Sequence, residues 1–396
     1  MRRPVLLLVA LSLGLLSATP PPAGAADPRL GPLLVSGNRI VNVAGKDVVL
    51  RGLHRDGTQG GPSTSPASVS AHEIEHLGNA RPGSWNANVV RVPVGSAQWT
   101  GACPTLATDA AAYRAAIDTE VQRITAQGIV ALLDLHTSTA GCTRIDRHAM
   151  PDAPVSQQFW ADAARRFALN RLVAFELYNE PHYVPDEIWL KGTTGATLQD
   201  CDLTPPYLAS PAARQAQQRE LAACRKTAPK YKAAGMQELY DIVSRAAPGH
   251  LIVVNAPGWA ASVPRLRVKA TRGQLVYGLH PYSCSVPGAA CNTAANARAN
   301  LALLKRWKPV AATVPVLVTE FGWPVYSKGY GQGYVDGAQY YRETIGILEQ
   351  QSPKWGWIAF AFDGNAGGGF SLLSSTTTYA PNSTGKPVFD ALRAKR

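Results

Sequence analysis

The stretch LVAFELYNEP, residues 172–181, sets the expected fold. Its first half is a short apolar run of the kind that forms a strand buried on both faces. The run leads directly into Asn179, Glu180 and Pro181. A carboxylate buried without a partner costs several kcal/mol. Glu180 therefore needs either a partner or a function, and the rest of the chain indicates which.

Seven further apolar runs end in polar residues in the same way. They cover residues 48–57, 87–95, 128–137, 251–259, 275–283, 314–324 and 356–365. Stretches with helical spacing lie between them, the clearest being 109–128, 156–170, 231–249 and 334–351. Eight strand–helix units predict an α/β fold, a (β/α)8 TIM barrel. The alternative, an open doubly wound sheet, would favour a glycine-rich phosphate turn, and neither GxGxxG nor GxxxxGK[ST] occurs.

The N-terminal region predicts two features outside the barrel strands. Residues 1–25 read as a secretory signal peptide, with two arginines, a short apolar run and the cleavage motif Ala23-Gly24-Ala25. A retained N-terminal anchor is the alternative. Residues 26–396 then form a single catalytic domain, and short apolar runs around Gly37-Asn38 predict a small N-terminal β-hairpin cap. We expect a protein secreted to the extracellular or periplasmic space, with no membrane segment after cleavage.

The charge distribution and the cysteine content limit the binding partners and the cross-links that we expect. The formal charge is +12, but the cations are not clustered among aromatic residues, so we expect no nucleic-acid binding. We expect no metal or cofactor, because neither a zinc spacing nor an Asp/Asn cluster occurs. We also expect a monomer. Six cysteines in an exported chain predict disulfides. Of 15 possible pairings, neighbours in order are favoured: Cys103 with Cys142, Cys201 with Cys224, and Cys284 with Cys291.

The polar residues at the strand ends form the candidate site. Besides Glu180, they are Arg91, His136, Asn179, His280, Tyr282 and Glu320. Strand carboxyl ends meet at one face of a TIM barrel. Glu180 on the fourth strand and Glu320 on the seventh should therefore face each other across it. Two carboxyls over one cavity are what cleavage of a glycosidic bond requires.

Five motifs, in order, resemble family 5 of the glycoside hydrolases, the cellulase family of clan A. They are VVRVP, LDLH, ELYNEPH, LHPYS and VTEFGWP, and the similarity extends from about residue 34 to 371. The resemblance implies a retaining double displacement with Glu180 as acid/base and Glu320 as nucleophile. It implies supporting roles for Arg91, His136, Asn179, His280 and Tyr282.

Two positions depart from the family pattern. The family usually has a tryptophan near the end of the eighth strand. Here the match falls on Phe362, or less closely on Phe360, and His54 stands where asparagine is common.

Substrate choice is the least determined feature. Trp259 and Trp323 follow strand ends and are expected, with Phe362, to stack on sugar rings. The long segment 182–227 is expected to form a disulfide-braced wall beside the cleft. We expect an endo-β-1,4-glucanase acting on a polysaccharide or oligosaccharide. The alternatives are the same mechanism on mannan, xylan, β-1,3/1,6-glucan or a glycoconjugate, and a barrel that binds sugar without cutting it. The residues do not decide endo against exo action, or hydrolysis against transglycosylation.

Overall fold

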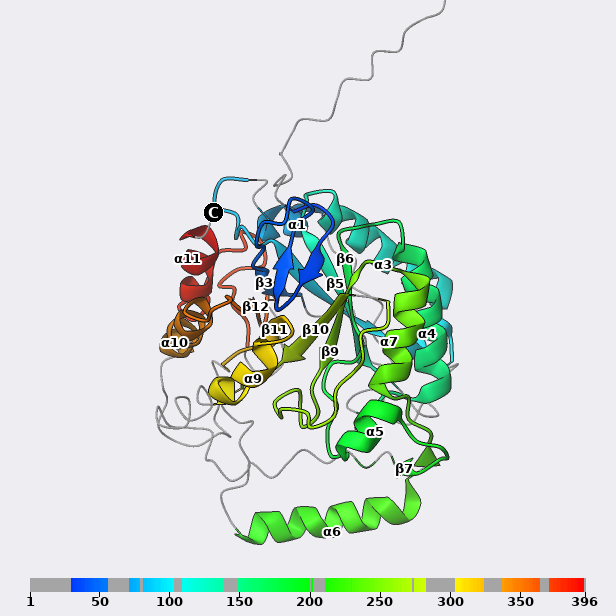
Figure 1. Cartoon of the computed structure of the whole chain (residues 1–396). Helices are drawn as coiled ribbons and strands as arrows, with labels where there is room; N and C mark the ends of the chain where they lie inside the picture. The colour runs from blue at the N-terminus through cyan, green and yellow to red at the C-terminus, as the bar shows by residue number, and fades with distance from the viewer. Residues whose placement is uncertain are drawn as a thin grey trace, which may run out of the picture.

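The computed structural model is dominated by one closed barrel (Figure 1). It describes residues 30–55, 71–78, 81–102, 109–138, 148–199, 201, 211–228, 230–272, 274–282, 303–323, 337–363 and 370–394. The eight strands are parallel, and each of the eight expected runs supplies one of them. They are β3 (Arg51–His54), β4 (Val89–Gly95), β5 (Val130–Thr137), β6 (Val173–Glu176), β9 (Leu251–Asn255), β10 (Gln274–Leu279), β11 (Val316–Phe321) and β12 (Gly356–Ala359). The TIM-barrel prediction is confirmed.

Strand alternation divides the core into two parts. One set of strand residues, including Val89, Val130, Leu251 and Leu317, packs together inside the barrel. The alternate residues pack outward against the helices. The hairpin of β1 (Leu34–Ser36) and β2 (Arg39–Val41) turns at Gly37-Asn38 as expected, with Gly37 at φ 61°. Ile40 of this hairpin packs on the interior set, so the hairpin caps the barrel.

The helices cover the outside of the barrel. Four expected helical stretches correspond to α3 (Ala110–Thr125), α4 (Ala153–Phe167), α7 (Met236–Ala246) and α10 (Gly337–Glu349). Asp109 caps α3 by accepting a hydrogen bond from the amide of Ala111 at 2.7 Å. Further helices in the described ranges are α1 (Ala71–Leu77), α2 (Ser96–Thr100), α9 (Lys308–Ala311) and α11 (Lys386–Ala394). Among the described residues, no helix combines the length and apolar character needed to span a bilayer.

The long segment after β6 carries its own elements. It contains α5 (Asp186–Lys191), β7 (Leu198–Gln199) and α6 (Pro211–Thr227), and β7 pairs with β8 (Lys230–Tyr231). Figure 1 shows α6 lying apart from the barrel helices. Cys201 and Cys224 are joined by a disulfide, which confirms that pairing. The other two expected disulfides, and the signal peptide, involve residues outside the described ranges.

Candidate active site

Six of the seven polar residues expected at the site lie at the carboxyl end of the barrel strands, whereas Arg91 lies in the first half of β4 and its guanidinium reaches Glu320. Arg91, His136 and Glu320 lie within β4, β5 and β11, whereas Asn179 and Glu180 follow β6, and His280 and Tyr282 follow β10. One carboxylate oxygen of Glu180, one of Glu320 and a ring nitrogen of His280 lie within 4.8 Å of one another. Two glutamates that are 140 positions apart in the sequence therefore share one site.

Glu320 is held by two donors. Nη1 of Arg91 donates to its Oε2 at 2.6 Å, and the hydroxyl of Tyr282 donates to its Oε1 at 2.6 Å. Burial, together with the negative charge of Glu320, raises the pKa of Tyr282 well above its usual value. The phenol therefore keeps its proton and remains a donor. Both contacts fix the position of the Glu320 carboxylate.

Arg91 is fully buried and connects most of the site. Its Nε and Nη2 form a bidentate pair with Glu176 at 2.8 Å for each bond, and Nη2 also donates to Oδ1 of Asn179 at 2.7 Å. Asp134 lies 2.9 Å from Nη2. Burial acts to lower the pKa of Arg91, but the charges of Asp134, Glu176 and Glu320 outweigh it and raise the pKa.

The sequence interpretation missed Asp134 and Glu176. Both are fully buried within strands, and both face the single guanidinium of Arg91. A signal was present, because each is a charged residue in the middle of an otherwise apolar strand run. Such a charge requires a buried partner of opposite sign.

Glu180 has a different environment from Glu320. Its side chain retains 21% exposure, against 9% for Glu320. Oε1 of Glu180 lies 2.8 Å from Nδ1 of His280. Burial acts to raise the pKa of Glu180, but the hydrogen bond and charge of His280, with the charges of His136 and His182, outweigh it and lower the pKa.

A chain of hydrogen bonds behind His280 sets its tautomer. The amide nitrogen of Asn255 donates to Glu176 and to the carbonyl of Asn179, so its Oδ1 is the acceptor. The hydroxyl of Thr319 donates to this Oδ1 at 3.2 Å. Because that uses the hydroxyl proton, Nε2 of His280, 3.0 Å away, must donate to Thr319. Nδ1 of His280 and Glu180 then share a single proton between them.

Two more histidines border the site. Nδ1 of His136 lies 2.6 Å from Asp134. Burial acts to lower the pKa of His136, but Asp134 outweighs it and raises the pKa. His54 accepts from Nη1 of Arg91 at 3.0 Å on its Nδ1, and burial followed by the charge of Arg91 lowers its pKa well below the usual value. His54 is therefore neutral, and its ring lies 5.7 Å from that of His136.

Trp259 lies beside the segment that carries Glu180. Its amide donates to the carbonyl of Pro181, and the next residue, Ala260, accepts from the amide of His280. Trp259 and Ala260 both have positive φ, at 62° and 54°, an unusual conformation for non-glycine residues that often occurs at functional sites. The indole stacks on His182 at 3.7 Å, while Tyr183 packs edge-on against it and is 58% exposed.

The aromatic residues after β12 differ from the sequence expectation. Phe362 is buried between Trp85 and Tyr379, with a stacked Tyr379 ring 5.7 Å away, and belongs to the core. Phe360 is half-buried instead, and its ring lies 4.6 Å from His54 at the edge of the site. Trp323 is also buried and packs on Tyr340. The structure thus places Phe360, rather than Phe362, where a sugar could contact it.

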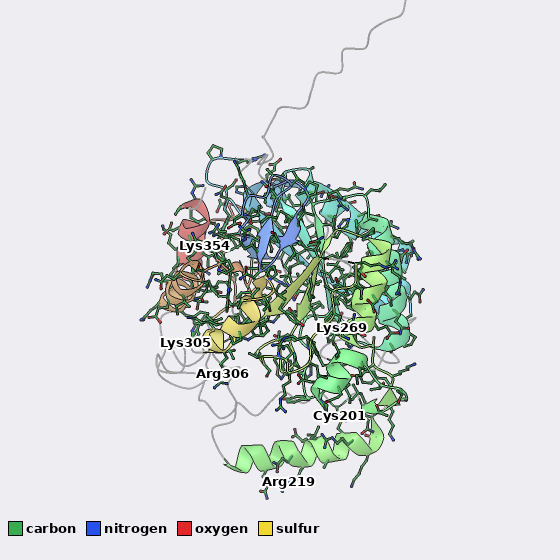
Figure 2. All side chains as sticks on the ribbon, in the orientation of Figure 1. Cys201, Arg219, Lys269, Lys305, Arg306 and Lys354 are labelled. Carbon is green, nitrogen blue, oxygen red and sulfur yellow. A yellow bond between two sulfur atoms is a disulfide. The ribbon has the colours of Figure 1, made fainter. Side chains whose placement is uncertain are left out.

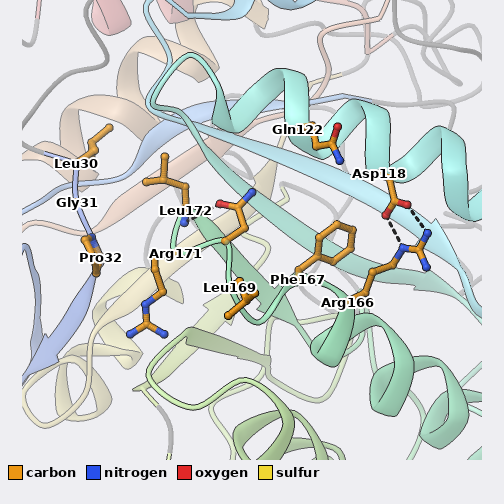
Figure 3. Close-up of a pocket in the computed structure, with 11 residues that line it drawn as sticks. Leu30, Gly31, Pro32, Asp118, Gln122, Arg166, Phe167, Leu169, Arg171 and Leu172 are labelled. Atoms are coloured by element: carbon orange, nitrogen blue, oxygen red, sulfur yellow. Dashed lines mark hydrogen bonds and ion pairs between the residues drawn. The ribbon is translucent and has the colours of Figure 1, made fainter. Parts of the chain in front are cut away.

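The structure also contains a possible cation-binding donor set and a separate cavity. Glu180, His280 and Glu320 together form a donor set that a divalent cation could occupy, although the same atoms are the expected catalytic groups. A separate cavity is lined by Leu30–Pro32, α3, the end of α4 and the turn before β6 (Figure 3). The Arg166–Asp118 ion pair lies on its wall. This cavity lies near the amino end of β6, away from the face where TIM-barrel sites occur.

Comparison with known proteins agrees with this geometry. The family model described as cellulase (glycosyl hydrolase family 5) matches residues 67–365. Among solved structures, the chain resembles the β-glucanase SdGluc5_26A from Saccharophagus degradans in complex with cellotetraose. The TM-score is 0.60, with 20% identity and coverage of 92% of this chain and 94% of that one. At this identity the likeness concerns the fold.

Two curated relatives match part of the chain. Manganese dependent endoglucanase Eg5A of Phanerodontia chrysosporium is 28% identical over 183 residues, or 45% of this chain, and Endoglucanase A of Butyrivibrio fibrisolvens is 26% identical over 153 residues, or 38%. The matched parts span 42% and 32% of those two proteins.

Proposed function

Because the chain belongs to glycosyl hydrolase family 5, we propose that it is a retaining β-glycoside hydrolase that acts as an endo-β-1,4-glucanase. One observation carries the proposal: carboxylate oxygens of Glu180 and Glu320 lie within 4.8 Å of each other. Retaining enzymes hold their two carboxyls about 5–5.5 Å apart, whereas inverting enzymes leave roughly 6.5–9.5 Å for a water molecule. The spacing supports direct attack by a carboxylate.

In the first step, Glu320 is the nucleophile. Its carboxylate oxygen forms a bond to the anomeric carbon, and the bond from that carbon to the leaving oxygen breaks. Glu180 gives its proton to the leaving oxygen, which departs with the electron pair. Arg91 and Tyr282 donate hydrogen bonds that aim the Glu320 carboxylate before attack. The product of this step is a glycosyl ester on Glu320.

In the second step, Glu180 acts as the base. It takes a proton from water, whose oxygen attacks the anomeric carbon and releases the Glu320 carboxylate. Asn179 is placed to bond the sugar 2-hydroxyl, and Nη2 of Arg91 orients its amide. Two inversions at one carbon give net retention. His280 shares a proton with Glu180, so it helps Glu180 to alternate between acid and base.

The β-1,4-glucan assignment is supported by the activities of similar proteins. Both curated relatives are called endoglucanases, and the similar β-glucanase was solved with cellotetraose. We propose that Trp259, Tyr183 and Phe360, which lie around the site, stack on sugar rings. We further propose that the enzyme is a monomer secreted after loss of residues 1–25. The mass of the exported protein and its sedimentation velocity test these two points.

A reducing-end assay across cellulose, mannan, xylan and laminarin tests the function and names the polymer. The largest turnover is expected on cellulose. Glu320→Ala must be inactive on every polymer, whereas the exposed control Glu220→Ala on α6 must retain full activity. Glu180→Gln should lose activity on polymers but keep some activity on aryl glycosides, whose leaving groups need no proton. Full turnover by Glu320→Ala would refute the assigned roles.

A further inference from the structure

One part of the chain contains no acidic residue. Residues 242–319 hold nine of the 39 lysines and arginines and none of the 27 aspartates and glutamates. In an average sequence of this length, both signs are present. Most of the net charge of +12 therefore comes from about a fifth of the chain.

Seven of these cations are described and exposed, and we call them the basic face. They are Arg265, Arg267, Lys269, Arg272, Lys305, Arg306 and Lys308. Within the described ranges, none of the seven forms an ion pair with a carboxylate. Exposed cations elsewhere do so, as in Arg39–Asp47, Arg81–Glu75 and Lys386–Asp390.

Packing joins the two segments that carry the basic face. The ring of Tyr277, on β10, lies 6.4 Å from that of Trp307, and its hydroxyl accepts from the amide of Val268 at 3.0 Å. Trp307 donates to the carbonyl of Ala261 at 3.4 Å. The guanidinium of Arg267 lies 5.9 Å from the Tyr277 ring centre. Residues 261–272 and 303–308 therefore share one side of the barrel over β10.

One end of this side of the barrel lies next to the candidate active site. The chain reaches residue 265 directly from Trp259, which contacts Pro181 beside Glu180, and from Ala260, which contacts His280. His280 and Tyr282 follow β10 itself. In Figure 2, Lys269, Lys305 and Arg306 lie in the lower half of the barrel as drawn, toward α6, whereas Lys354 lies well above Lys305 near α10 and α11. A polymer bound at Glu180 and Glu320 that extends to this side would meet these cations.

We propose that the basic face binds a polysaccharide that carries carboxylate groups, such as uronic acid residues, along a β-glycan backbone. This inference rests on the proposed function, because the cleft would hold the same chain. Unpaired exposed cations attract anions over about a Debye length, roughly 10 Å at 0.1 M salt. The two aromatic residues here, Tyr277 and Trp307, are buried, so the face lacks the stacking platforms of single-strand nucleic-acid sites.

A membrane surface fits the basic face less well. Membrane-binding faces combine cations with exposed apolar side chains. Among described residues, the exposed large apolar side chains are Val43, Leu169 and Tyr183, and none of them belongs to residues 261–308. The observations thus favour a hydrophilic polyanion.

The test measures binding in the inactive Glu320→Ala background. Carboxymethyl cellulose is the anionic probe and hydroxyethyl cellulose the neutral probe, because both have a β-1,4-glucan backbone. The test variant carries Lys269→Gln, Lys305→Gln and Arg306→Gln. The matched control carries Lys46→Gln, Arg165→Gln and Lys354→Gln, three exposed cations elsewhere, for the same change in net charge.

At 20 mM salt, the test variant should bind carboxymethyl cellulose about 5- to 10-fold more weakly, since three exposed charge contacts are lost. Its binding to hydroxyethyl cellulose should not change. The control should change less than twofold, and 200 mM salt should remove most of the difference. Equal losses in both variants, or no loss in either, would overturn the proposal.

Two further measurements separate the possible explanations. Tighter binding of a 20-base-pair DNA duplex than of carboxymethyl cellulose would overturn the proposal in favour of a nucleic-acid partner. Turnover of hydroxyethyl cellulose by the chain with Glu320 intact tests the proposed function alone, because this polymer carries no charge. A failure of catalysis is therefore distinguishable from a failure of the basic face.

Discussion

Nη1 of Arg91 donates a 2.6 Å hydrogen bond to Oε2 of Glu320, and both side chains are buried. The same guanidinium also pairs with Glu176 and lies 2.9 Å from Asp134. One cation thus balances three carboxylates below the cleft. The proposed nucleophile, Glu320, is held by a network that also stabilises the barrel, so stability and activity should both depend on Arg91.

Replacing Arg91 should therefore lower both stability and activity. Arg91→Met keeps the volume but leaves three buried carboxylates without their cation, which should lower the free energy of unfolding by about 3–5 kcal/mol. Urea denaturation measures the change. The matched variant Arg165→Met, at an exposed position on α4, should change it by less than about 0.5 kcal/mol. Similar stability of the two variants would contradict the network.

His280 should control the pH range of catalysis. Its hydrogen bond and charge lower the pKa of Glu180, and Glu180 must be protonated to act as the acid. Activity should therefore decline as pH rises through this lowered pKa. His280→Gln removes the charge, so the pKa of Glu180 should rise and the alkaline limb of kcat/KM should move to higher pH. A limb that stays in place, or moves to lower pH, would contradict the pairing.

Thr319 should act on Glu180 through His280. Thr319→Val has nearly the same shape but leaves Oδ1 of Asn255 and Nε2 of His280 without their shared partner. An unsatisfied buried polar group costs about 1–3 kcal/mol. The variant should lose stability and alter the pH profile of kcat/KM, and Thr319→Ser should restore both. A role in packing alone would be indicated if Ser were no better than Val.

Glu120 should make the fold less stable as pH rises. Burial raises its pKa from 4.5 to about 7, and its nearest cation, Arg55, is 3.5 Å away. Between these values the unfolded chain loses the proton first, so the free energy of unfolding falls as pH rises from about 4.5 to 7. The loss is on the order of 3 kcal/mol. Glu120→Gln should remove this slope in urea titrations at pH 4.5, 6 and 7.5. An unchanged slope would assign it to other groups.

Sequence patterns predicted the barrel well because parallel strands buried on both faces produce long apolar runs. Each of the eight runs became a strand, and both glutamates were placed by their positions at strand ends. The same physical rule explains why Asp134 and Glu176 were missed. They lie within the runs, and only the coordinates show that Arg91 faces both. Charge pairing across three strands is not visible in a linear pattern.

The aromatic residues were harder to predict, because a side chain's direction after a strand depends on the local backbone. β12 ends at Ala359, so the alternation that would point Phe362 inward no longer applies. Phe360 contacts His54 instead, while Phe362 packs on Tyr379. The aromatic residues proposed to contact the sugar lie in such irregular segments, which is why the sequence predicts the two glutamates better than the substrate.

The stereochemistry of the first product tests the central claim most directly. Proton NMR of the polymer that gives the highest turnover records which anomer forms before mutarotation. If Glu320 attacks the sugar while Glu180 protonates the leaving oxygen, the β-anomer must appear first. Initial formation of the α-anomer would mean that water attacks directly, and it would contradict the assignment of Glu320 as the nucleophile.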